Sequence, residues 1–241
     1  MILEVQRLSK DFGGLQALRE VSFSVEEGEI VGIIGPNGAG KTTIFNLLTG
    51  FHPVTSGRII FRGEDITHVF PPSEIARRGL VRTFQIVKPF GNMTVLENVM
   101  VGAFVRHSLT AQARKRALEI IEFVELDRYI DTPAKNLTTA GRKRLEVARA
   151  LATEPRLLLL DEVMAGLTPT EVREFLPLIR EIRDRGVTLL VIEHIMAAIM
   201  NVSERIIVLH HGEKIAEGTP YQVAEDPKVI EAYLGEEFSV A

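Results

Sequence analysis

The stretch from Gly35 to Thr43 combines glycines, a lysine and two threonines at a spacing that suits phosphate binding, and it directly follows the apolar run Ile30–Ile34. Glycines at these positions let the backbone turn tightly, so that successive N–H groups can point inward at phosphate oxygens. A helix beginning near Lys41 would add the partial positive charge of its N-terminus. We expect Lys41 to reach the β- and γ-phosphates of a nucleotide and the Thr42 hydroxyl to bind Mg²⁺. The predicted phosphate-binding loop consists of Gly35, Pro36, Asn37, Gly38, Ala39, Gly40, Lys41, Thr42 and Thr43.

Two carboxylates end a second apolar run, in which Leu157–Leu160 leads into Asp161 and Glu162. A buried strand that ends in acids delivers them to the carboxyl edge of a sheet, beside the phosphate loop. We expect Asp161 to hold Mg²⁺, directly or through water, opposite Thr42. Glu162 is expected to polarise the water that attacks the γ-phosphate. Acids at a strand-to-helix turn are also common as N-caps, but the phosphate loop upstream favours the catalytic interpretation.

Three further residues are candidates for the same site. His194 ends the apolar strand predicted over 187–193 and can hydrogen-bond the γ-phosphate or the polarising carboxylate. Gln85 lies where strand-rich sequence gives way to helical sequence, and it can ligate Mg²⁺ and water when the helical part swings inward. Phe12 precedes two glycines and can stack on adenine. Each also has a structural alternative: a histidine at a helix start, an exposed glutamine and a core or edge phenylalanine.

The elements that position these residues can be predicted from periodicity. In Val21–Val25 apolar side chains occupy every second position, which is typical of a half-buried antiparallel strand, and Leu3–Val5 predicts a shorter one. A helix is expected from the phosphate loop to Leu48, and a strand over Arg58–Phe61. The N-terminal part is therefore predicted to form an antiparallel β subdomain.

Residues 89–151 change to helical spacing, with apolar residues three and four positions apart and charges between them. Strand character then returns in three apolar runs, with a helix over 169–185 between the first two. The three runs are Leu157–Leu160, 187–192 and 205–209. A hairpin at 211–213 and a terminal helix over 226–234 complete the prediction. Buried parallel strands alternating with helices indicate a βαβ architecture.

The sequence therefore predicts an α/β fold with a P-loop NTPase core, an N-terminal antiparallel β subdomain and an inserted α-helical subdomain. Its length of 241 residues suits one large domain with an insertion or two small domains. We predict a single domain. Its catalytic core comprises residues 1–88 and 152–241, and its helical subdomain comprises residues 89–151.

Composition excludes several classes of protein. With 28 Lys and Arg against 32 Asp and Glu, the net charge of −4 argues against a nucleic-acid-binding protein. The short basic clusters Arg77–Arg78, Lys115–Arg116 and Arg142–Arg144 are interpreted as solvated helix faces. There are no cysteines, which is compatible with a reducing cytoplasm, and no signal peptide is recognised. No apolar run approaches the roughly 18 residues of a spanning helix, so membrane association is expected only through partners.

With these motifs in this order, the chain resembles the ATP-binding cassette (ABC) ATPases over essentially its full length. Phe12 matches the adenine-stacking aromatic of that family, Gly35–Thr43 its Walker A loop, and Gln85 its Q-loop. Asp161 and Glu162 match the end of Walker B, and His194 matches the switch histidine. The resemblance implies a RecA-like core that binds ATP and Mg²⁺ and hydrolyses ATP to ADP and phosphate. Catalytic roles then fall to Glu162, His194, Lys41 and Gln85, and metal binding to Thr42, Gln85 and Asp161.

Within that family, several segments look like the ATPase subunit of branched-chain amino-acid uptake transporters. They are Arg82–Gln85, Met93–Asn98, Ala216–Pro220 and Ala232–Glu236. The ATPase subunit of a urea or other amide importer is closely similar and is the alternative. The resemblance implies a second ABC ATPase subunit, identical or paralogous, transmembrane permease subunits and, indirectly, a solute-binding protein. It places the chain peripherally at the cytoplasmic face of the cell membrane, with no nucleic acid as partner.

The family's signature sequence, usually Leu-Ser-Gly-Gly-Gln, is replaced here by Leu137-Thr138-Thr139-Ala140-Gly141. Thr138 keeps a hydroxyl that can donate to a γ-phosphate of the second cassette's nucleotide. Ala140 and Gly141 can keep the N–H donors of a helix N-terminus. Val163 and Thr168 also differ from the usual proline and aspartate or asparagine. These departures leave open a slow-hydrolysing, ATP-gated cassette without a transport role. A cassette acting in DNA repair or translation is disfavoured, because neither a coiled-coil insertion nor a second cassette is present.

Overall fold

Two β-sheets form the centre of the computed structural model, which describes residues 1–85 and 88–237. The antiparallel sheet has the order β2-β1-β4-β5 and consists of β1 (Leu3–Phe12), β2 (Leu15–Val25), β4 (Ser56–Phe61) and β5 (Glu64–Asp65). The second sheet has the order β10-β9-β3-β8-β7-β6 and consists of β3 (Ile30–Ile34), β6 (Leu80–Arg82), β7 (Leu157–Asp161), β8 (Thr188–Ile192), β9 (Arg205–His210) and β10 (Glu213–Gly218). Its strands are parallel except β10, which is antiparallel to β9.

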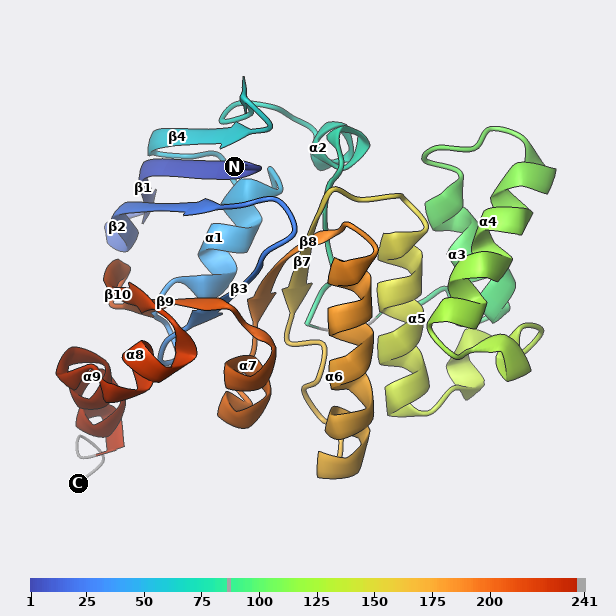
Figure 1. The fold of residues 1–241 in the computed structure, drawn as a ribbon. Helices are drawn as coiled ribbons and strands as arrows, with labels where there is room; N and C mark the ends of the chain where they lie inside the picture. The colour runs from blue at the N-terminus through green and yellow to red at the C-terminus, as the bar shows by residue number, and fades with distance from the viewer. Residues whose placement is uncertain (86–87, 238–241) are drawn as a thin grey trace.

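Helices cover both faces of the parallel sheet. Figure 1 shows α1 between the two sheets, α5 to α7 across the other face, and α3 and α4 at the side away from the C-terminus. The helices are α1 (Lys41–Leu48), α2 (Pro72–Arg78), α3 (Val95–Ala103), α4 (Thr110–Phe123), α5 (Thr139–Leu151), α6 (Pro169–Asp184), α7 (Met196–Val202), α8 (Pro220–Glu225) and α9 (Pro227–Glu237). Across residues 1–85 and 88–237, no helix has the length and apolar composition needed to cross a membrane.

The parallel strands are apolar throughout because side chains from both faces are buried. In β7, Leu158 and Leu160 pack in the core cluster that contains Phe175 of α6. Leu157 and Leu159 point the other way and pack in the cluster that contains Phe45 of α1. Each fully buried leucine stabilises the fold by about 1.5–3 kcal/mol relative to an exposed one. Burial on both faces fixes where each strand ends, and hence where the polar residues after it lie.

The fold class predicted from the sequence is confirmed, including the antiparallel β subdomain and the inserted helices. The hairpin predicted at 211–213 joins β9 to β10. The prediction of a short first strand at Leu3–Val5 was wrong. β1 continues to Phe12, with shifts of register after Val5 and Leu8 that interrupt its alternating pattern. The short elements β6, α2, α7 and α8 were not predicted, because three to seven residues give little periodicity.

Parts of two predicted features lie outside the described residues. Residues 86–87 and 238–241 belong to the predicted catalytic core, and the side chains of 234–236 belong to the Ala232–Glu236 motif.

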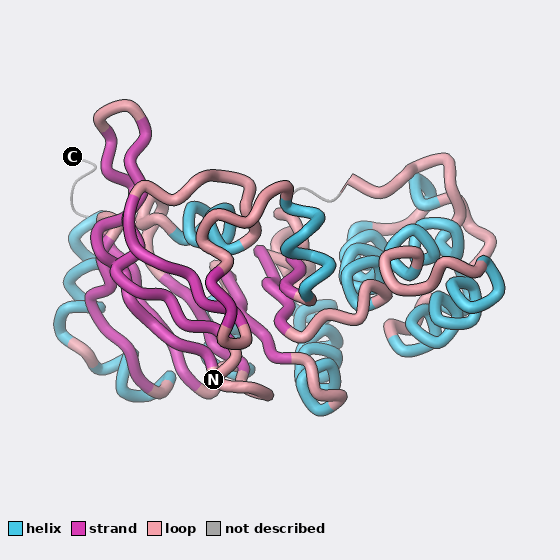
Figure 2. Tube along the Cα trace, turned by 90° about the horizontal axis from the view of Figure 1, so that it is seen from above, coloured by secondary structure: helices cyan, strands magenta, loops and turns pink. Residues whose placement is uncertain are grey.

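Helices α3, α4 and α5 form a group beside the sheets. In the view from above in Figure 2, most strands gather on one side and these helices on the other. Close packing between α3 and α5 depends on Gly102. A Cβ atom at this position would lie 2.2 Å from the backbone oxygen of Arg149 and 3.2 Å from the Cβ of Ala152. A side chain at Gly102 would therefore push the two helices apart.

We predict that Gly102→Ala destabilises the protein by about 1–3 kcal/mol, although alanine is the better helix former by about 0.5–1 kcal/mol. The matched control is Gly91→Ala, since a Cβ there would meet only the Cβ of Lys135 at 3.5 Å. Urea denaturation gives the free energy of unfolding of both variants. A Gly102→Ala variant as stable as the control would contradict the close approach of the two helices.

Candidate functional site

Four neighbouring strands bring the candidate residues to one edge of the parallel sheet. The order β3-β8-β7-β6 places the carboxyl ends of these strands side by side. The phosphate loop 35–43 follows β3, His194 follows β8, Asp161 and Glu162 stand at the end of β7, and Gln85 follows β6. The pairing of Asp161 with Ile192 sets the register of β7 and β8, so the two strands end at the same level. Such an edge is where open α/β sheets bind their ligands.

Two glycines of the phosphate loop occupy positions where a side chain does not fit. Gly35 has a φ of 152°, and a Cβ there would lie 2.1 Å from the backbone oxygen of Leu209. Gly40 has a φ of 102° just before α1, and its Cβ would lie 2.6 Å from a methyl carbon of Leu18. The loop is thus held against β2 and β9 by close backbone contact, with Asn37 and Gly38 exposed at its tip.

Lys41, the first residue of α1, lies folded over this loop. Its Nζ donates to the backbone oxygens of Gly35 at 2.6 Å and Pro36 at 2.8 Å, and the residue is buried. Thr42 is exposed and Thr43 half-buried beside it. The ammonium group is therefore positioned at the loop, next to the N-terminus of α1, where an anion is favoured.

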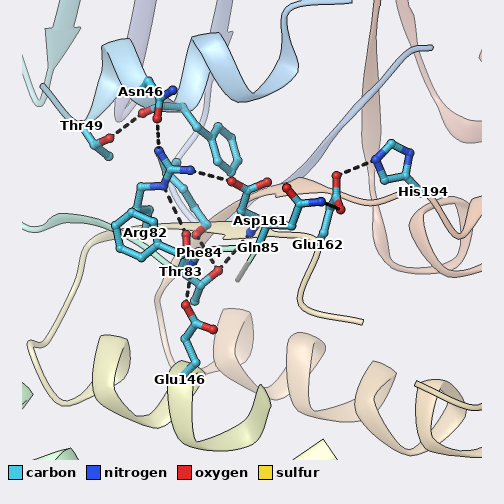
Figure 3. Close-up of polar contacts among 12 residues, drawn as sticks. Asn46, Thr49, Arg82, Thr83, Phe84, Gln85, Glu146, Asp161, Glu162 and His194 are labelled. Atoms are coloured by element: carbon cyan, nitrogen blue, oxygen red, sulfur yellow. Dashed lines mark hydrogen bonds and ion pairs between the residues drawn. The ribbon is translucent and has the colours of Figure 1, made fainter. Parts of the chain in front are cut away.

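The carboxylate of Glu162 is held between Gln85 and His194 (Figure 3). Gln85 Nε2 donates to Oε2 at 2.7 Å, and His194 Nε2 lies 2.5 Å from Oε1. The Glu162 backbone has a φ of 51°, in the left-handed region, and its N–H donates to Ile192 at 2.9 Å. For a residue other than glycine, this conformation costs about 1–3 kcal/mol and is found mostly at functional sites. The arrangement fixes a nearly buried carboxylate in one orientation, which is what a group that polarises water requires.

Asp161 forms a buried ion pair with Arg82 of β6 (Figure 3). Arg82 Nη2 lies 2.6 Å from Asp161 Oδ2, while Nη1 donates to Asn46 Oδ1 of α1 at 2.6 Å. Burial raises the pKa of Asp161 above its ordinary value, and the guanidinium opposes this shift without cancelling it. The second oxygen, Oδ1, is buried and has no hydrogen-bond partner among the described residues.

This unpaired oxygen bears on whether the residues fit Mg²⁺. The carboxylate of Asp161, the Thr42 hydroxyl and the amide oxygen of Gln85 are all hard oxygen donors of the kind that Mg²⁺ prefers. Gln85 uses its amide nitrogen towards Glu162, which leaves the amide oxygen to act as the donor. The donor set therefore fits Mg²⁺, with water and phosphate oxygens completing an octahedral shell.

Helix α5 supports the site through two buried charges that the sequence analysis missed. Lys143 Nζ donates to the backbone oxygens of Glu162 at 2.9 Å and Gln85 at 3.4 Å. Glu146 Oε1 accepts the Phe84 N–H at 2.5 Å, and burial raises the pKa of Glu146. The interpretation of Arg142–Arg144 as a solvated face was therefore wrong for Lys143. Lys143 lies four residues before the apolar Val147, and this spacing, which puts both on one face of a helix, could have indicated that Lys143 is buried.

Glu193, next to His194, is a third buried charge that was not predicted. Its Oε1 accepts the Met164 N–H at 2.8 Å and so ties the end of β8 to the segment after Glu162. Its Oε2 has no hydrogen-bond partner among the described residues. Burial raises the pKa of Glu193 to about 7, from an ordinary value of 4.5.

The other predicted residues lie on β1 and at the start of α5. Phe12 ends β1 and is partly exposed, with its ring edge-to-face with His52 at 5.3 Å and Lys10 Nζ 4.8 Å from its centroid. Thr138 is the N-cap of α5, and its Oγ1 accepts the Gly141 N–H at 3.1 Å. Thr138, Ala140 and Gly141 thus lie at the start of the helix that carries Lys143 and Glu146.

A phosphate loop after a central parallel strand, beside two acids that end the neighbouring strand, defines a P-loop nucleotide-binding protein. A family model described as ABC transporter matches residues 18–165, and one described as branched-chain amino acid ATP-binding cassette transporter matches residues 213–239. The chain belongs to the ABC transporter family, in the group of branched-chain amino acid ATP-binding cassettes. It is an ABC transporter ATPase, as the sequence predicted.

Full-length similarity supports this assignment. The high-affinity branched-chain amino acid transport ATP-binding protein BraF of Pseudomonas aeruginosa is 43% identical, and the alignment covers 98% of each chain. The ADP conformation of MJ1267, an ATP-binding cassette of an ABC transporter, superimposes with a TM-score of 0.88 at 35% identity, covering 97% of this chain and 98% of the other. The dimeric ABC transporter cassette MJ0796 gives a TM-score of 0.81 at 26% identity, over 91% and 99%.

The raised pKa of Glu193 predicts a pH-dependent stability. Between pH 4.5 and about 7 the native state keeps a proton that the unfolded state releases, so the free energy of unfolding falls as pH rises through that window. The full effect is about 3 kcal/mol. Glu193→Gln removes this titration and keeps an oxygen that can accept the Met164 N–H. We expect the stability of the variant relative to wild type to rise across this window and to level off above it.

Urea denaturation at a series of pH values measures this difference. The matched control is Glu122→Gln, the same change at an exposed residue of α4, measured at the same pH values. A stability difference between Glu193→Gln and wild type that does not vary with pH would show that the Glu193 carboxyl titrates alike in the folded and unfolded states.

Proposed function

We propose that this chain binds ATP with Mg²⁺ and hydrolyses it to drive the uptake of branched-chain amino acids by a transporter whose membrane subunits are separate chains. The C-terminal match over residues 213–239 and the full-length similarity to BraF support the substrate class. The arrangement of Gln85, Glu162 and His194 carries the hydrolytic part of the proposal.

ATP binding is assigned to the loop 35–43 and to Phe12. Backbone N–H groups of the loop bind the phosphates, and the Lys41 ammonium exchanges its contacts with Gly35 and Pro36 for phosphate oxygens. The exposed ring of Phe12 stacks on the adenine. Neither change requires the loop to refold, because its glycines already hold the turned backbone.

Thr42, Gln85 and Asp161 hold Mg²⁺ in this proposal, and the unpaired Oδ1 of Asp161 supports the assignment. The bound ion would neutralise charge on the phosphates. Arg82 keeps Asp161 fixed through its other carboxylate oxygen. Gln85 connects this group to Glu162, so its position affects both metal binding and catalysis.

Hydrolysis is assigned to Glu162 as the general base. A carboxylate oxygen accepts a hydrogen bond from the attacking water and takes its proton as the water oxygen bonds to the γ-phosphorus. The bond from that phosphorus to the bridging oxygen of the β-phosphate breaks, and ADP leaves with the bonding electron pair. His194 and Gln85 set the direction of the carboxylate through their hydrogen bonds. The His194 ring, which is partly exposed, can also donate to the γ-phosphate once ATP is bound.

A second cassette, identical or paralogous, completes the site in this proposal. Thr138, Ala140 and Gly141 lie at the start of α5, where helix N–H groups would face the nucleotide of the partner. The dimeric structure of MJ0796 supports such an arrangement. Residues 89–151 then act as a helical subdomain, and the contacts of Lys143 with Glu162 and Gln85 transmit its movement to the catalytic core.

We predict that Glu162→Gln lowers ATP hydrolysis by at least about 100-fold in the complete transporter, while ATP binding is retained. Glutamine keeps the size and hydrogen bonding of the side chain but cannot take a proton. Phosphate release and nucleotide binding are measured on the same preparation, with Glu122→Gln as the control. A wild-type complex that hydrolyses ATP no faster than Glu162→Gln would contradict the role of Glu162 and favour a slow, ATP-gated cassette.

Contact with permease subunits is assigned to an exposed apolar surface near the start of the helical subdomain. Phe51 and Phe84 lie edge-to-face at 5.6 Å, and both are more than two-fifths exposed, as is Phe90. The backbone of Phe90 is fixed by buried Asn98, which accepts its N–H and donates to its oxygen. A rigid, exposed aromatic surface of this kind is typical of a docking site. Through it the chain would lie peripherally at the cytoplasmic face of the membrane, linked indirectly to a solute-binding protein.

We predict that Phe90→Ser lowers amino-acid uptake at least about tenfold and leaves ATP binding unchanged, because a docking contact is lost and the phosphate loop is not touched. Uptake into proteoliposomes and nucleotide binding are compared with those of Tyr221→Ser, which removes an even more exposed aromatic from α8. Loss of ATP binding in Phe90→Ser would count against docking as its role. Urea uptake instead of branched-chain amino-acid uptake would favour the amide importer.

A further inference from the structure

A cavity lies at the opposite end of the parallel sheet from the phosphate loop. It has a volume of about 910 Å³, and its lining includes Arg156, just before β7, and Val187, just before β8. The ends of α2, α5 and α6 and part of α4 complete its walls. Of these helices, α2 lies near the top of the view in Figure 1. Because the loop 35–43 follows the carboxyl end of β3, the cavity and the proposed ATP site do not overlap.

Positive charge is concentrated in this cavity. Seven arginines and two glutamates line it, in a chain whose net charge is −4. Within the described ranges, four of these arginines have no carboxylate at ion-pair distance: Arg62, Arg106, Arg156 and Arg185. Like charges gathered in a concave surface repel one another and raise the local positive potential, so an anion that binds there relieves the repulsion.

The remaining arginines are held in place by acids. Arg78 pairs with Glu64, and Arg116 lies 3.4 Å from Glu154. Both glutamates of the lining are therefore already engaged. The charge that remains free to bind a ligand is positive and comes from guanidinium groups, which match phosphate oxygens in a two-point geometry.

The lining also contains apolar side chains. Phe61, Ile120, Leu151 and Ile182 are among the lining residues, and each is buried. The Arg185 guanidinium lies 3.6 Å from the centroid of the Phe123 ring, which is a stacking distance. A flat ring of a ligand could extend this stack, since guanidinium planes and aromatic faces both accept flat partners.

From this combination we propose that the cavity is a second nucleotide site, which binds a nucleoside polyphosphate independently of the phosphate loop. The phosphates lie among the unpaired arginines, and the base stacks beside Arg185 and Phe123. The cavity volume falls within the range of about 300–1,000 Å³ that small-molecule sites occupy. An inorganic polyphosphate would leave the stack of Arg185 and Phe123 without a partner, and an uncharged aromatic molecule would leave the arginines unpaired.

Equilibrium dialysis of the full chain with labelled ATP tests the proposal. We expect two ATP molecules per chain in the wild type and one in the double variant Arg156→Glu/Arg185→Glu. The milder Arg156→Gln/Arg185→Gln variant should weaken the second site at least about tenfold, and it serves if the charge reversal disturbs folding. The matched control is Arg114→Glu/Lys115→Glu, which reverses two exposed charges of α4 outside the cavity and should keep both sites.

Two further measurements distinguish the second site from the phosphate loop and from a simple polyanion site. Lys41→Ala should weaken ATP binding at the phosphate loop and leave binding at the second site intact. Loss of binding at one site can therefore be distinguished from loss at the other. Tripolyphosphate should compete at least about tenfold less well than ATP for the second site, because it lacks the ring. One ATP per chain in the wild type, or two in both arginine variants, would overturn the proposal. Equal competition by tripolyphosphate and ATP would contradict a nucleotide site and show that the cavity binds polyanions in general.

Discussion

The left-handed backbone of Glu162 is the constraint on which the candidate site depends. At a φ of 51° the chain turns sharply out of β7, and this turn directs the carboxylate towards Gln85 and His194. The backbone N–H of Glu162 donates a hydrogen bond to Ile192 at the end of β8, and its backbone oxygen accepts a hydrogen bond from the ammonium of Lys143. Contacts from the ends of β6 and β8 and from α5 therefore converge on one residue. They supply the interactions that offset about 1–3 kcal/mol of backbone strain, and movement of any of these elements alters the carboxylate.

The same edge keeps charged groups buried with one oxygen each unsatisfied. Asp161, Glu146 and Glu193 each accept a hydrogen bond or ion pair on one carboxylate oxygen, while the other has no partner among the described residues. Such oxygens are rare in protein interiors, because leaving one unpaired costs about 1–3 kcal/mol. The raised pKa values of all three acids reflect this burial. The protein thus carries a strained electrostatic arrangement at the end of the sheet that binding of a charged ligand can relieve.

Whether a feature could be predicted from the sequence depends on how far apart its interacting residues lie along the chain. The phosphate loop was recognisable because its glycines, Lys41 and Thr42 act within one short segment. Asp161, Glu162 and His194 were recognisable because each ends an apolar run. The ion pair of Arg82 with Asp161 joins residues 79 positions apart, and it exists because β6 pairs with β7. Strand order is not encoded in local periodicity, so no spacing rule could reveal that partner.

Buried charges on helices were missed for a related reason. The periodic pattern of α5 places Lys143 and Glu146 on the buried face, but a charge within a basic run is usually solvated. Only the position of the α5 axis against the ends of β6 and β7 shows that these side chains have polar partners there. The first strand was predicted to be too short because bulges disturb the alternating pattern of β1, although its pairing with β2 continues.

Helix α5 also bears on the unusual segment at its start. Thr138 caps the helix by accepting the Gly141 N–H, so the replacement of the usual signature residues leaves the helix N-terminus formed. From that cap the helix reaches Lys143, whose ammonium bonds to Glu162 and Gln85, within little more than one turn. A displacement of the capped end would thus pass to the carboxylate of Glu162 through a rigid element. The substitutions Ala140 and Gly141 change the surface presented by this element and preserve its connection to Glu162.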